Sequence, residues 1–293
     1  MTDFKHQIAV VTGAGSGIGK AIALELGRQG ATLVLAGRRM EKLKEVADSA
    51  MATATRVRCY QIDLTKDDEI LHLTDCIKDE FKGVDVLIHS AAVISLGYIE
   101  SAPLDEFDRQ YRTNVRAPFA LTQALLPTLR ARRGQIVFIN SQAGLFAGAN
   151  LSQYSATKYA LKAIADSLRS EVDACGIRVL SVYPGRTASP MQSFVYELEG
   201  KKYTPVGLIQ PEDIANLVIN ALSLPFCTEV NDIIINTTKC ISKYKKIMTT
   251  SRFLVSRSGM VLKRAIPRRK LSKPIGGAKI EEADATGGKP FLT

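Results

Sequence analysis

The chain lacks the features of disulfide-linked, zinc-binding and membrane-spanning proteins. It has no tryptophan, and its five cysteines form no Cys-x-x-Cys pair and have no histidine at ligand spacing. We therefore expect free thiols in a reducing compartment and no metal site. No apolar run is long enough to cross a bilayer. Residues 1–7 are polar and lead directly into a strand-like segment, so we expect no signal peptide and a cytoplasmic location.

Positive charge is concentrated at the C-terminal end. The net charge is +10, but residues 239–293 carry 14 basic and three acidic residues, whereas residues 1–238 carry 25 basic and 26 acidic ones. The basicity therefore belongs to the tail, and we do not expect a nucleic-acid partner.

The tail is predicted to contain a basic amphipathic helical extension over residues 239–266. Within residues 243–266 an apolar face lies between two basic flanks. One hypothesis is a helix on an anionic membrane surface, so that the protein is peripheral to a membrane. The other is a helix that covers the protein's own body or a partner subunit. Residues 267–293, rich in Pro, Gly and charge, are predicted to be disordered.

Residues 1–238 alternate short apolar segments with helical ones. Strands are predicted at 8–11, 32–36, 57–61, 84–89, 135–140, 178–183 and 232–236. Helices are predicted at 17–29, 40–53, 66–81, 103–131, 151–174 and 211–222. This alternation predicts an α/β domain, Rossmann-like and doubly wound, with a mostly parallel seven-stranded sheet flanked by helices.

A glycine-rich segment lies where the first strand meets the first helix. Glycines there allow a tight turn and a close backbone approach to a pyrophosphate, which the helix N-terminus also favours. The predicted dinucleotide-binding residues of this segment are Gly13, Gly15, Ser16, Gly17, Ile18 and Gly19.

The end of the second strand indicates which dinucleotide binds. NAD-binding proteins of this fold usually place a carboxylate there for the ribose hydroxyls. Here Gly37 takes that place, and the guanidinium of Arg38 follows it. An arginine at this position suits the 2′-phosphate of NADP(H), so NADP(H) is predicted over NAD(H). The alternative is that Arg38 is only an exposed charge at the start of a surface helix.

A second group of residues is a candidate catalytic group. Tyr154 and Lys158 lie four residues apart in the predicted helix 151–174, so they share one helical face. A Tyr-x-x-x-Lys pair alone is also common in amphipathic helices. Ser141, however, ends a strand thirteen residues before Tyr154, and Asn114 lies in the preceding long helix.

The TGxxxGIG and YxxxK patterns together resemble the short-chain dehydrogenase/reductase family, in its compact single-domain branch, over about residues 5–238. The resemblance implies that Asn114, Ser141, Tyr154 and Lys158 are catalytic and that Lys158 also holds the nicotinamide ribose. It implies a homodimer or homotetramer through helices 103–131 and 151–174. The further cofactor contacts that it implies are Asp63 and Leu64 at the adenine, Ala91 at the adenosine ribose, and Pro184, Gly185, Thr187 and Ser189 at the nicotinamide.

Two of these contacts have plainer explanations. Asp63 could be only a helix cap, and Pro184 with Gly185 could be only a turn that ends a strand.

The family's usual Asn-Asn-Ala-Gly segment is here His89-Ser90-Ala91-Ala92, which retains only the alanine. We expect His89 to be a structural hydrogen bonder rather than a catalytic group.

The chemistry expected of the four residues follows from charge. A tyrosine titrates near 10, and an acid or base works best near the ambient pH. A lysine ammonium about 4 Å away, at an effective dielectric constant near 20, supplies roughly the energy needed to lower that pKa to about 7. Ser141 is expected to donate to the substrate oxygen. Asn114 is expected to disturb its helix and to position water in a proton relay.

These expectations lead to an NADP(H)-dependent oxidoreductase that interconverts a ketone or aldehyde and an alcohol by hydride transfer. The alternative is a catalytically silent dinucleotide-sensing or scaffold protein of the same fold. The apolar side chains of residues 190–210 suggest a small-molecule substrate with hydrophobic parts, although a compact polar substrate also fits.

Overall fold

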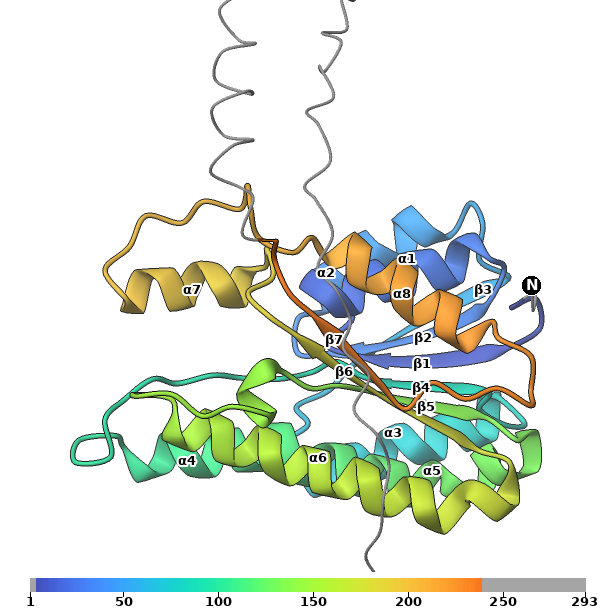
Figure 1. The fold of residues 1–293 in the computed structure, drawn as a ribbon. Coiled ribbons are helices and arrows are strands. Elements are labelled where there is room, and N and C mark those ends of the chain that lie inside the picture. The colour runs from blue at the N-terminus through green and yellow to red at the C-terminus, as the bar shows by residue number, and fades with distance from the viewer. Residues whose placement is uncertain (1–3, 239–293) are drawn as a thin grey trace, which may run out of the picture. The chain divides into compact units, whose positions relative to one another are not determined.

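Seven parallel strands form the core of the protein (Figure 1). The computed structural model describes residues 4–238, so the predictions for residues 239–266 and 267–293 lie outside the described residues. The sheet order is β3-β2-β1-β4-β5-β6-β7, and every neighbouring pair is parallel. The strands are β1 (Ile8–Thr12), β2 (Thr32–Gly37), β3 (Arg56–Gln61), β4 (Val86–His89), β5 (Gln135–Ile139), β6 (Arg178–Pro184) and β7 (Asp232–Ile235).

Helices cover both faces of this sheet, which confirms the predicted doubly wound α/β fold. On one face lie α1 (Gly17–Arg28), α2 (Met40–Ala50) and α8 (Pro211–Leu222), and on the other α3 (Asp67–Glu80), α5 (Ala117–Arg132) and α6 (Ser152–Val172). Successive strand residues point to opposite faces, so Val11 packs in the first layer and Val10 in the second. Burial on both faces explains why the five central strands are almost continuously apolar, whereas the edge strands β3 and β7 are partly exposed.

The predicted helix 103–131 is wrong as a single element. It consists of α4 (Leu104–Tyr111), a π-helical turn at Arg112–Arg116 and α5. Asn114 lies in the turn, and its side chain bonds the backbone of Val93, a residue 21 positions earlier. This anchoring gives a physical reason for the local widening of the helix at Asn114.

Residues 190–198 form a helix, α7 (Pro190–Leu198), that was not predicted. Its N-cap is Ser189, whose Oγ accepts a hydrogen bond from the backbone N–H of Gln192 at 3.2 Å. Pro190 follows at the first helical position, where proline is favoured. Both are local start signals, so the sequence contained the information for this helix.

Residues 4–238 contain neither a helix that could span a membrane nor a metal-binding cluster. No helix there is long and apolar enough to span a bilayer. No cluster of three or more His, Cys, Asp or Glu side chains within those residues is arranged to hold a metal ion. The four cysteines of the same region, Cys59, Cys76, Cys175 and Cys227, are all free thiols.

Candidate active site

A cavity of about 770 Å³ runs along the carboxyl ends of the strands, where the strand order reverses between β1 and β4. Most of the predicted site residues line it. These are Gly13, Gly15, Ser16, Gly17, Ile18, Arg38, Asp63, Leu64, Ala91, Ser141, Tyr154, Lys158, Pro184, Gly185, Thr187 and Ser189. Gly19 and Asn114 are the two predicted residues that do not line it.

The glycine-rich turn after β1 depends on close approaches between backbones. Gly13 has a φ of +65°, and a Cβ there would lie 2.8 Å from backbone atoms of Ala91. Gly19 sits in α1, where a Cβ would lie 2.5 Å from the carbonyl oxygen of Gly13. Gly19 therefore lets the helix pack onto the turn instead of contacting a ligand, which explains its absence from the cavity wall.

The far end of the cavity is basic. Gly37 and Arg38 line it, together with Arg39 and Lys42, which were not predicted. A Cβ on Gly37 would meet only the side chain of Leu43, at 3.4 Å, so glycine is not required there by packing. Lys42 lies in the first turn of α2, directly after the loop that carries Arg38 and Arg39.

Asp63 lies beside this basic end, and its hydrogen bonds exclude the helix-cap explanation. Its Oδ1 accepts from the backbone N–H of Thr65 at 3.0 Å and from the Thr65 hydroxyl at 2.8 Å. The backbone hydrogen bond from Thr65 is the largest cause that holds the pKa of Asp63 below its ordinary value. The N-cap of α3 is Lys66, so Asp63 closes a turn before the helix instead of capping it.

The unusual segment after β4 is braced from β1. Thr12 Oγ1 accepts from the backbone N–H groups of Ser90 and Ala91 at 3.1 and 3.2 Å, and donates to the Ile88 carbonyl at 3.2 Å. Sequence analysis did not identify this role of Thr12. The bracing keeps Ala91 against the glycine-rich turn without the usual asparagines.

His89 is a structural residue, as expected. It is 3% exposed, its Nε2 shares a 2.8 Å hydrogen bond with Thr122 Oγ1, and its ring stacks on Phe138 at 4.9 Å. Burial lowers the pKa of His89 to about 3, so the ring is neutral at physiological pH.

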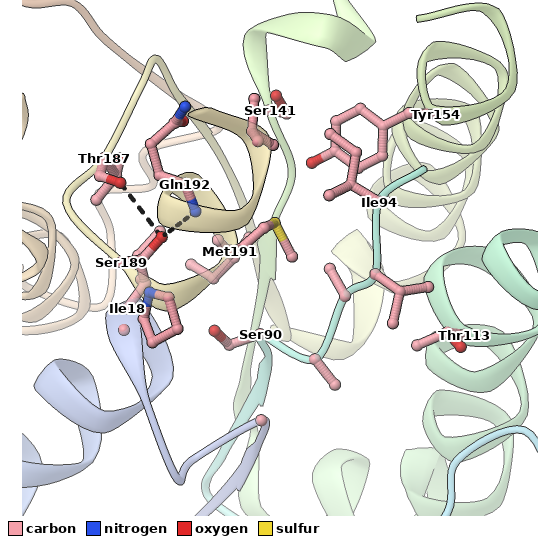
Figure 2. Close-up of a pocket in the computed structure, with 18 of the residues that line it drawn as sticks. Ile18, Ser90, Ile94, Thr113, Ser141, Tyr154, Thr187, Ser189, Met191 and Gln192 are labelled. Atoms are coloured by element: carbon pink, nitrogen blue, oxygen red, sulfur yellow. Dashed lines mark hydrogen bonds between the residues drawn. The ribbon is translucent and has the colours of Figure 1, made fainter. Parts of the chain in front are cut away.

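Ser141, Tyr154 and Lys158 come together where β5 ends against α6. Asn140 joins the two elements, because its Nδ2 donates to the Lys158 carbonyl at 3.2 Å and its Oδ1 accepts from the Ser141 N–H at 2.9 Å. Sequence analysis missed Asn140, although an asparagine directly before Ser141 at a strand end was a signal. Figure 2 shows Ser141 and Tyr154 at the same end of the pocket.

The electrostatics of Tyr154 and Lys158 differ from the expectation. Burial raises the pKa of Tyr154 to about 12, while the hydrogen bond with Ser141 acts in the opposite direction. Burial also lowers the pKa of Lys158 to about 7. The physical reason is that both groups lie out of water, which penalises phenolate and ammonium alike. Lys158 Nζ donates to the Ile139 carbonyl at 3.0 Å and lies 5.8 Å from the centre of the Tyr154 ring.

Asn114 does not line the cavity but supports its wall through hydrogen bonds. Its Oδ1 accepts from the Val93 N–H at 2.9 Å, and its Nδ2 donates to the Val93 carbonyl at 2.9 Å and to Thr157 Oγ1 at 3.1 Å. The expectation that Asn114 disturbs its helix is confirmed by the π-helical turn. Because both Nδ2 hydrogens are used by protein partners, the side chain ties the loop after β4 to α6 and is not placed to donate to a ligand.

Thr187 and Ser189 bond within their own loop (Figure 2). Thr187 Oγ1 donates to the Gly185 carbonyl at 3.0 Å, and Ser189 Oγ donates to the Thr187 carbonyl at 3.2 Å. Both oxygens keep acceptor capacity toward the cavity. Several apolar side chains also line the cavity: Ile94, Leu96, Phe146, Leu151, Met191 and Val195.

Comparison with known proteins gives a consistent result. The family described as short chain dehydrogenase matches residues 7–199. An uncharacterized oxidoreductase of Staphylococcus aureus (strain USA300) is 35% identical over 234 residues, which is 80% of this chain and 98% of the relative.

Solved structures give the same fold. A metagenomic short-chain oxidoreductase in complex with NADP has a TM-score of 0.70 and 28% identity, covering 81% of this chain and 99% of that one. A short-chain type dehydrogenase/reductase from Mycobacterium marinum has a TM-score of 0.72 and 27% identity, covering 80% and 95%.

Proposed function

Because the chain belongs to the short-chain dehydrogenase/reductase family of oxidoreductases, we propose that it interconverts a ketone or aldehyde and an alcohol with NADP(H). The observation that carries this proposal is a single cavity. Ser141, Tyr154 and Lys158 line one end of it, while the glycine-rich turn and Arg38 line the rest. An acid/base group and a dinucleotide cradle in one cavity are what hydride transfer to a carbonyl requires.

The residues at the cofactor end fit NADP(H). The turn at Gly13 and the N-terminus of α1 suit a pyrophosphate, because the backbone comes close there and the helix dipole favours negative charge. Arg38, with no carboxylate at Gly37, suits the 2′-phosphate. The NADP complex of the metagenomic relative agrees with this choice. The other proposed cofactor contacts are Gly15, Ser16, Gly17, Ile18, Asp63, Leu64, Ala91, Lys158, Pro184, Gly185, Thr187 and Ser189.

The protein's own residues move the proton. When bound, the reduced cofactor supplies a hydride to the carbonyl carbon. Tyr154 gives its proton to the carbonyl oxygen, and its raised pKa keeps it protonated for this step at neutral pH. Ser141 donates to the same oxygen, where negative charge builds. In the oxidative direction Tyr154 accepts the proton, and the ammonium form of Lys158 favours the phenolate.

Turnover distinguishes this proposal from a silent sensor of the same fold. The test follows the loss of NADPH absorbance by the purified protein with a panel of ketones and aldehydes. Carbonyl-dependent NADPH consumption is the expected result. Tight NADPH binding with no consumption by any panel member would favour the sensing or scaffold alternative.

We expect Arg38→Ala to raise the dissociation constant for NADPH by about 30-fold and to leave that for NADH nearly unchanged. The reason is the loss of a charge-assisted contact with a phosphate that only NADPH carries. Fluorescence titration with both cofactors measures the effect, and Lys44→Ala is the control because Lys44 is exposed on α2 and outside the cavity wall. An unchanged preference would refute the assignment of Arg38.

We expect the opposite design, Gly37→Asp, to reverse the cofactor preference. Gly37 does not have the positive φ that favours glycine, and the only atoms near a new Cβ would be those of Leu43, so the aspartate fits. Its carboxylate repels the 2′-phosphate and accepts hydrogen bonds from the ribose hydroxyls of NADH. The same titration is the measurement, and retained preference for NADPH would contradict the prediction.

We also propose that the protein is a homodimer or homotetramer. Large apolar side chains are exposed on the helices predicted to form the contact, with Tyr111 on α4, Phe119 on α5 and Tyr159 on α6 each more than 40% exposed. Burying them between subunits would remove apolar surface from water. Light scattering of the purified protein gives the subunit number.

A further inference from the structure

The buried side chain of α4 is a glutamine, Gln110. It is 0% exposed, and it is the one residue of that helix that is buried. A buried amide destabilises the fold unless the protein replaces its hydrogen bonds to water, whereas an apolar side chain carries no such penalty. The partners of Gln110 therefore indicate what the glutamine does at this position.

Both ends of the Gln110 amide are bonded, and they are bonded to different segments. Its Oε1 accepts from the backbone N–H of Ser95 at 3.1 Å, and its Nε2 donates to Oε1 of Gln153 at 3.1 Å. Gln153 in turn donates through its own Nε2 to the Pro103 carbonyl at 2.8 Å. The amide thus joins the segment after β4 to the first turn of α6, at the residue directly before Tyr154.

The bonds of Gln110 repeat those of Asn114, four residues later in the chain. Asn114 accepts from the N–H of Val93 and donates to Thr157 on α6. Gln110 accepts from an N–H two residues further along the same segment and donates to a residue one turn earlier on α6. The two amides form two bridges between the segment after β4 and α6, which we call the Asn114 bridge and the Gln110 bridge. Tyr154 lies on the stretch of α6 between their two attachment points.

The segment held by these bridges has no regular structure of its own. Residues 90–98 form neither a helix nor a strand, so their backbone groups depend on partners elsewhere in the chain. Gly97 donates its N–H to the Asn150 carbonyl at 2.9 Å. Val93, Ser95 and Gly97 are therefore held by three different parts of the chain, which fixes the backbone at every second residue.

The side chains between these fixed points form part of the cavity wall. Ile94 and Leu96 line the cavity, whereas Ser95 does not. Figure 2 shows Ile94 and Tyr154 among the side chains that line the pocket. Apolar wall residues suit an apolar part of a small ligand, so this wall fits the hydrophobic part of a substrate.

The Gln110 bridge holds a later part of the segment than the part assigned to the cofactor. Ala91 is the proposed cofactor contact of this segment, and it lies two residues before Val93, where the Asn114 bridge holds the backbone. Loss of the Gln110 bridge would leave that hold in place and would release the backbone further along, at Ser95.

We propose that Gln110 is a positioning residue that sets substrate specificity by holding Ile94 and Leu96 as a fixed apolar wall in the cavity that contains Tyr154. This rests on the proposed function. A wall that is already held in place binds an apolar chain without first having to be ordered. The favoured substrates are then ketones or aldehydes with an apolar chain of several carbons, and small ketones that do not reach the wall are insensitive to Gln110.

A series of methyl ketones from propanone to octan-2-one tests the proposal. We expect kcat/KM of the wild type to rise with chain length, because each added methylene removes apolar surface from water. Gln110→Met keeps the length of the side chain but removes both hydrogen bonds, so the Ser95 N–H loses its acceptor. The preference for octan-2-one over propanone should fall by about tenfold, through a higher KM, while propanone is reduced as by the wild type.

Gln29→Met is the matched control. Gln29 lies at the end of α1, outside the cavity wall, and its Nε2 donates to Glu25 Oε1 at 3.0 Å, so this variant also loses a side-chain hydrogen bond. It should keep the wild-type dependence on chain length. An unchanged dependence in Gln110→Met would overturn the proposal, and so would an equal loss for every ketone. Weaker NADPH binding in Gln110→Met would also overturn it, because the bridge would then serve the cofactor.

Gln153→Met breaks the same bridge without altering a fully buried residue. We expect a loss in the same direction as in Gln110→Met, and a loss in the double variant that is smaller than the product of the two single losses. The reason is that two residues of one hydrogen-bonded bridge do not act additively. Multiplying losses would overturn the proposal, because the two glutamines would then act independently.

Amide hydrogen exchange, followed by NMR, tests the hold on the segment directly. We expect the Ser95 N–H to exchange at least about tenfold faster in Gln110→Met than in the wild type, and the Val93 N–H to exchange at the same rate in both. Equal exchange of the Ser95 N–H in the two proteins would overturn the positioning role.

Binding measurements separate this proposal from the proposed reaction. Octan-2-one and propanone are titrated by NMR into the wild type and Gln110→Met, both saturated with NADP⁺. Tighter binding of octan-2-one by the wild type than by Gln110→Met supports the role of Gln110 even if no ketone is reduced. Equal binding of octan-2-one by the two proteins overturns the role, whether or not turnover is observed.

Discussion

Tyr154→Phe is expected to lower kcat for carbonyl reduction by about 10²- to 10⁴-fold, the usual contribution of a general acid. The substitution removes one oxygen, and the ring remains in its buried position, where it is 7% exposed. No hydrogen bond from the Tyr154 hydroxyl supports the fold in the described residues except that with Ser141. We therefore expect NADPH binding and thermal stability to stay close to those of the wild type.

A matched control lies five residues further along the same helix. Tyr159 also carries a hydroxyl, which donates to the Leu145 carbonyl at 2.5 Å, but its side chain is 44% exposed and does not line the cavity. Tyr159→Phe should leave kcat nearly unchanged. Single-turnover measurements of NADPH oxidation compare the two variants. Undiminished turnover by Tyr154→Phe would contradict the proposed mechanism, and equal losses in both variants would point to a general effect of altering α6.

The parts of the site that were predictable from sequence are those fixed by local spacing. Tyr154 and Lys158 are one helical turn apart, and the glycines from Gly13 to Gly19 lie between a strand and a helix, so short-range geometry determines both groups. The parallel sheet was also predictable, because its central strands are buried on two faces and are mostly apolar. The position of the cavity follows from these elements, because the strand order reverses between β1 and β4.

What was missed depends on contacts between distant segments. The π-helical turn at Asn114 is held by Val93, and the bracing of Ala91 comes from Thr12, 79 positions away. Neither Val93 nor Thr12 can be identified as a hydrogen-bond partner from its spacing in the sequence. Within residues 4–238 the side-chain Nε2 of Gln192 is buried and has no hydrogen-bond partner, which only the packing of the folded chain determines.

The pKa values were mispredicted for a related reason. An ammonium beside the Tyr154 hydroxyl lowers the tyrosine pKa only where desolvation does not outweigh it. In the folded protein Tyr154 and Lys158 are both buried, and loss of hydration is the largest influence on each. Local sequence can indicate that two groups are neighbours, but the degree of burial depends on the whole fold.

Burial of Lys158 leads to the second large expected effect, in which Lys158→Met removes activity and makes the protein more stable at neutral pH. Lys158 is 1% exposed, and within residues 4–238 its Nζ donates to the Ile139 carbonyl. Its pKa falls from 10.5 to about 7 in the folded protein. A lysine with a lowered folded pKa opposes folding, since the unfolded chain binds the proton more tightly.

The sign and pH range of this effect follow from the two pKa values. Below about pH 7 Lys158 is charged in both states and the full cost of burying the charge is present. Between about pH 7 and 10.5 the folded protein has lost the proton and the unfolded chain still holds it, so wild-type stability rises with pH. Methionine has no such penalty. The advantage of Lys158→Met should therefore be largest at or below pH 7 and should shrink as pH rises toward 10.

The expected gain in the free energy of unfolding is the difference between two contributions. A pKa lowered from 10.5 to about 7 corresponds to about 5 kcal/mol at about 1.36 kcal/mol for each unit, and the Ile139 carbonyl left without its donor costs about 2 kcal/mol. The net gain is on the order of 3 kcal/mol, or about 6–12 °C in Tm for a domain of this size. Thermal unfolding at pH 7 and at pH 9.5 measures it, and kcat should fall by at least about 10²-fold in the same variant.

Lys162→Met is the control, because Lys162 lies one turn further along α6 but is partly exposed and paired with Asp166. Its pKa is raised by the hydrogen bond to Asp166, so its loss should not stabilise the protein. A Lys158→Met variant that unfolds at a lower temperature than the wild type at pH 7 would contradict the argument, as would an advantage that grows with pH. The expected result would mean that Lys158 is held where catalysis needs it at the expense of stability.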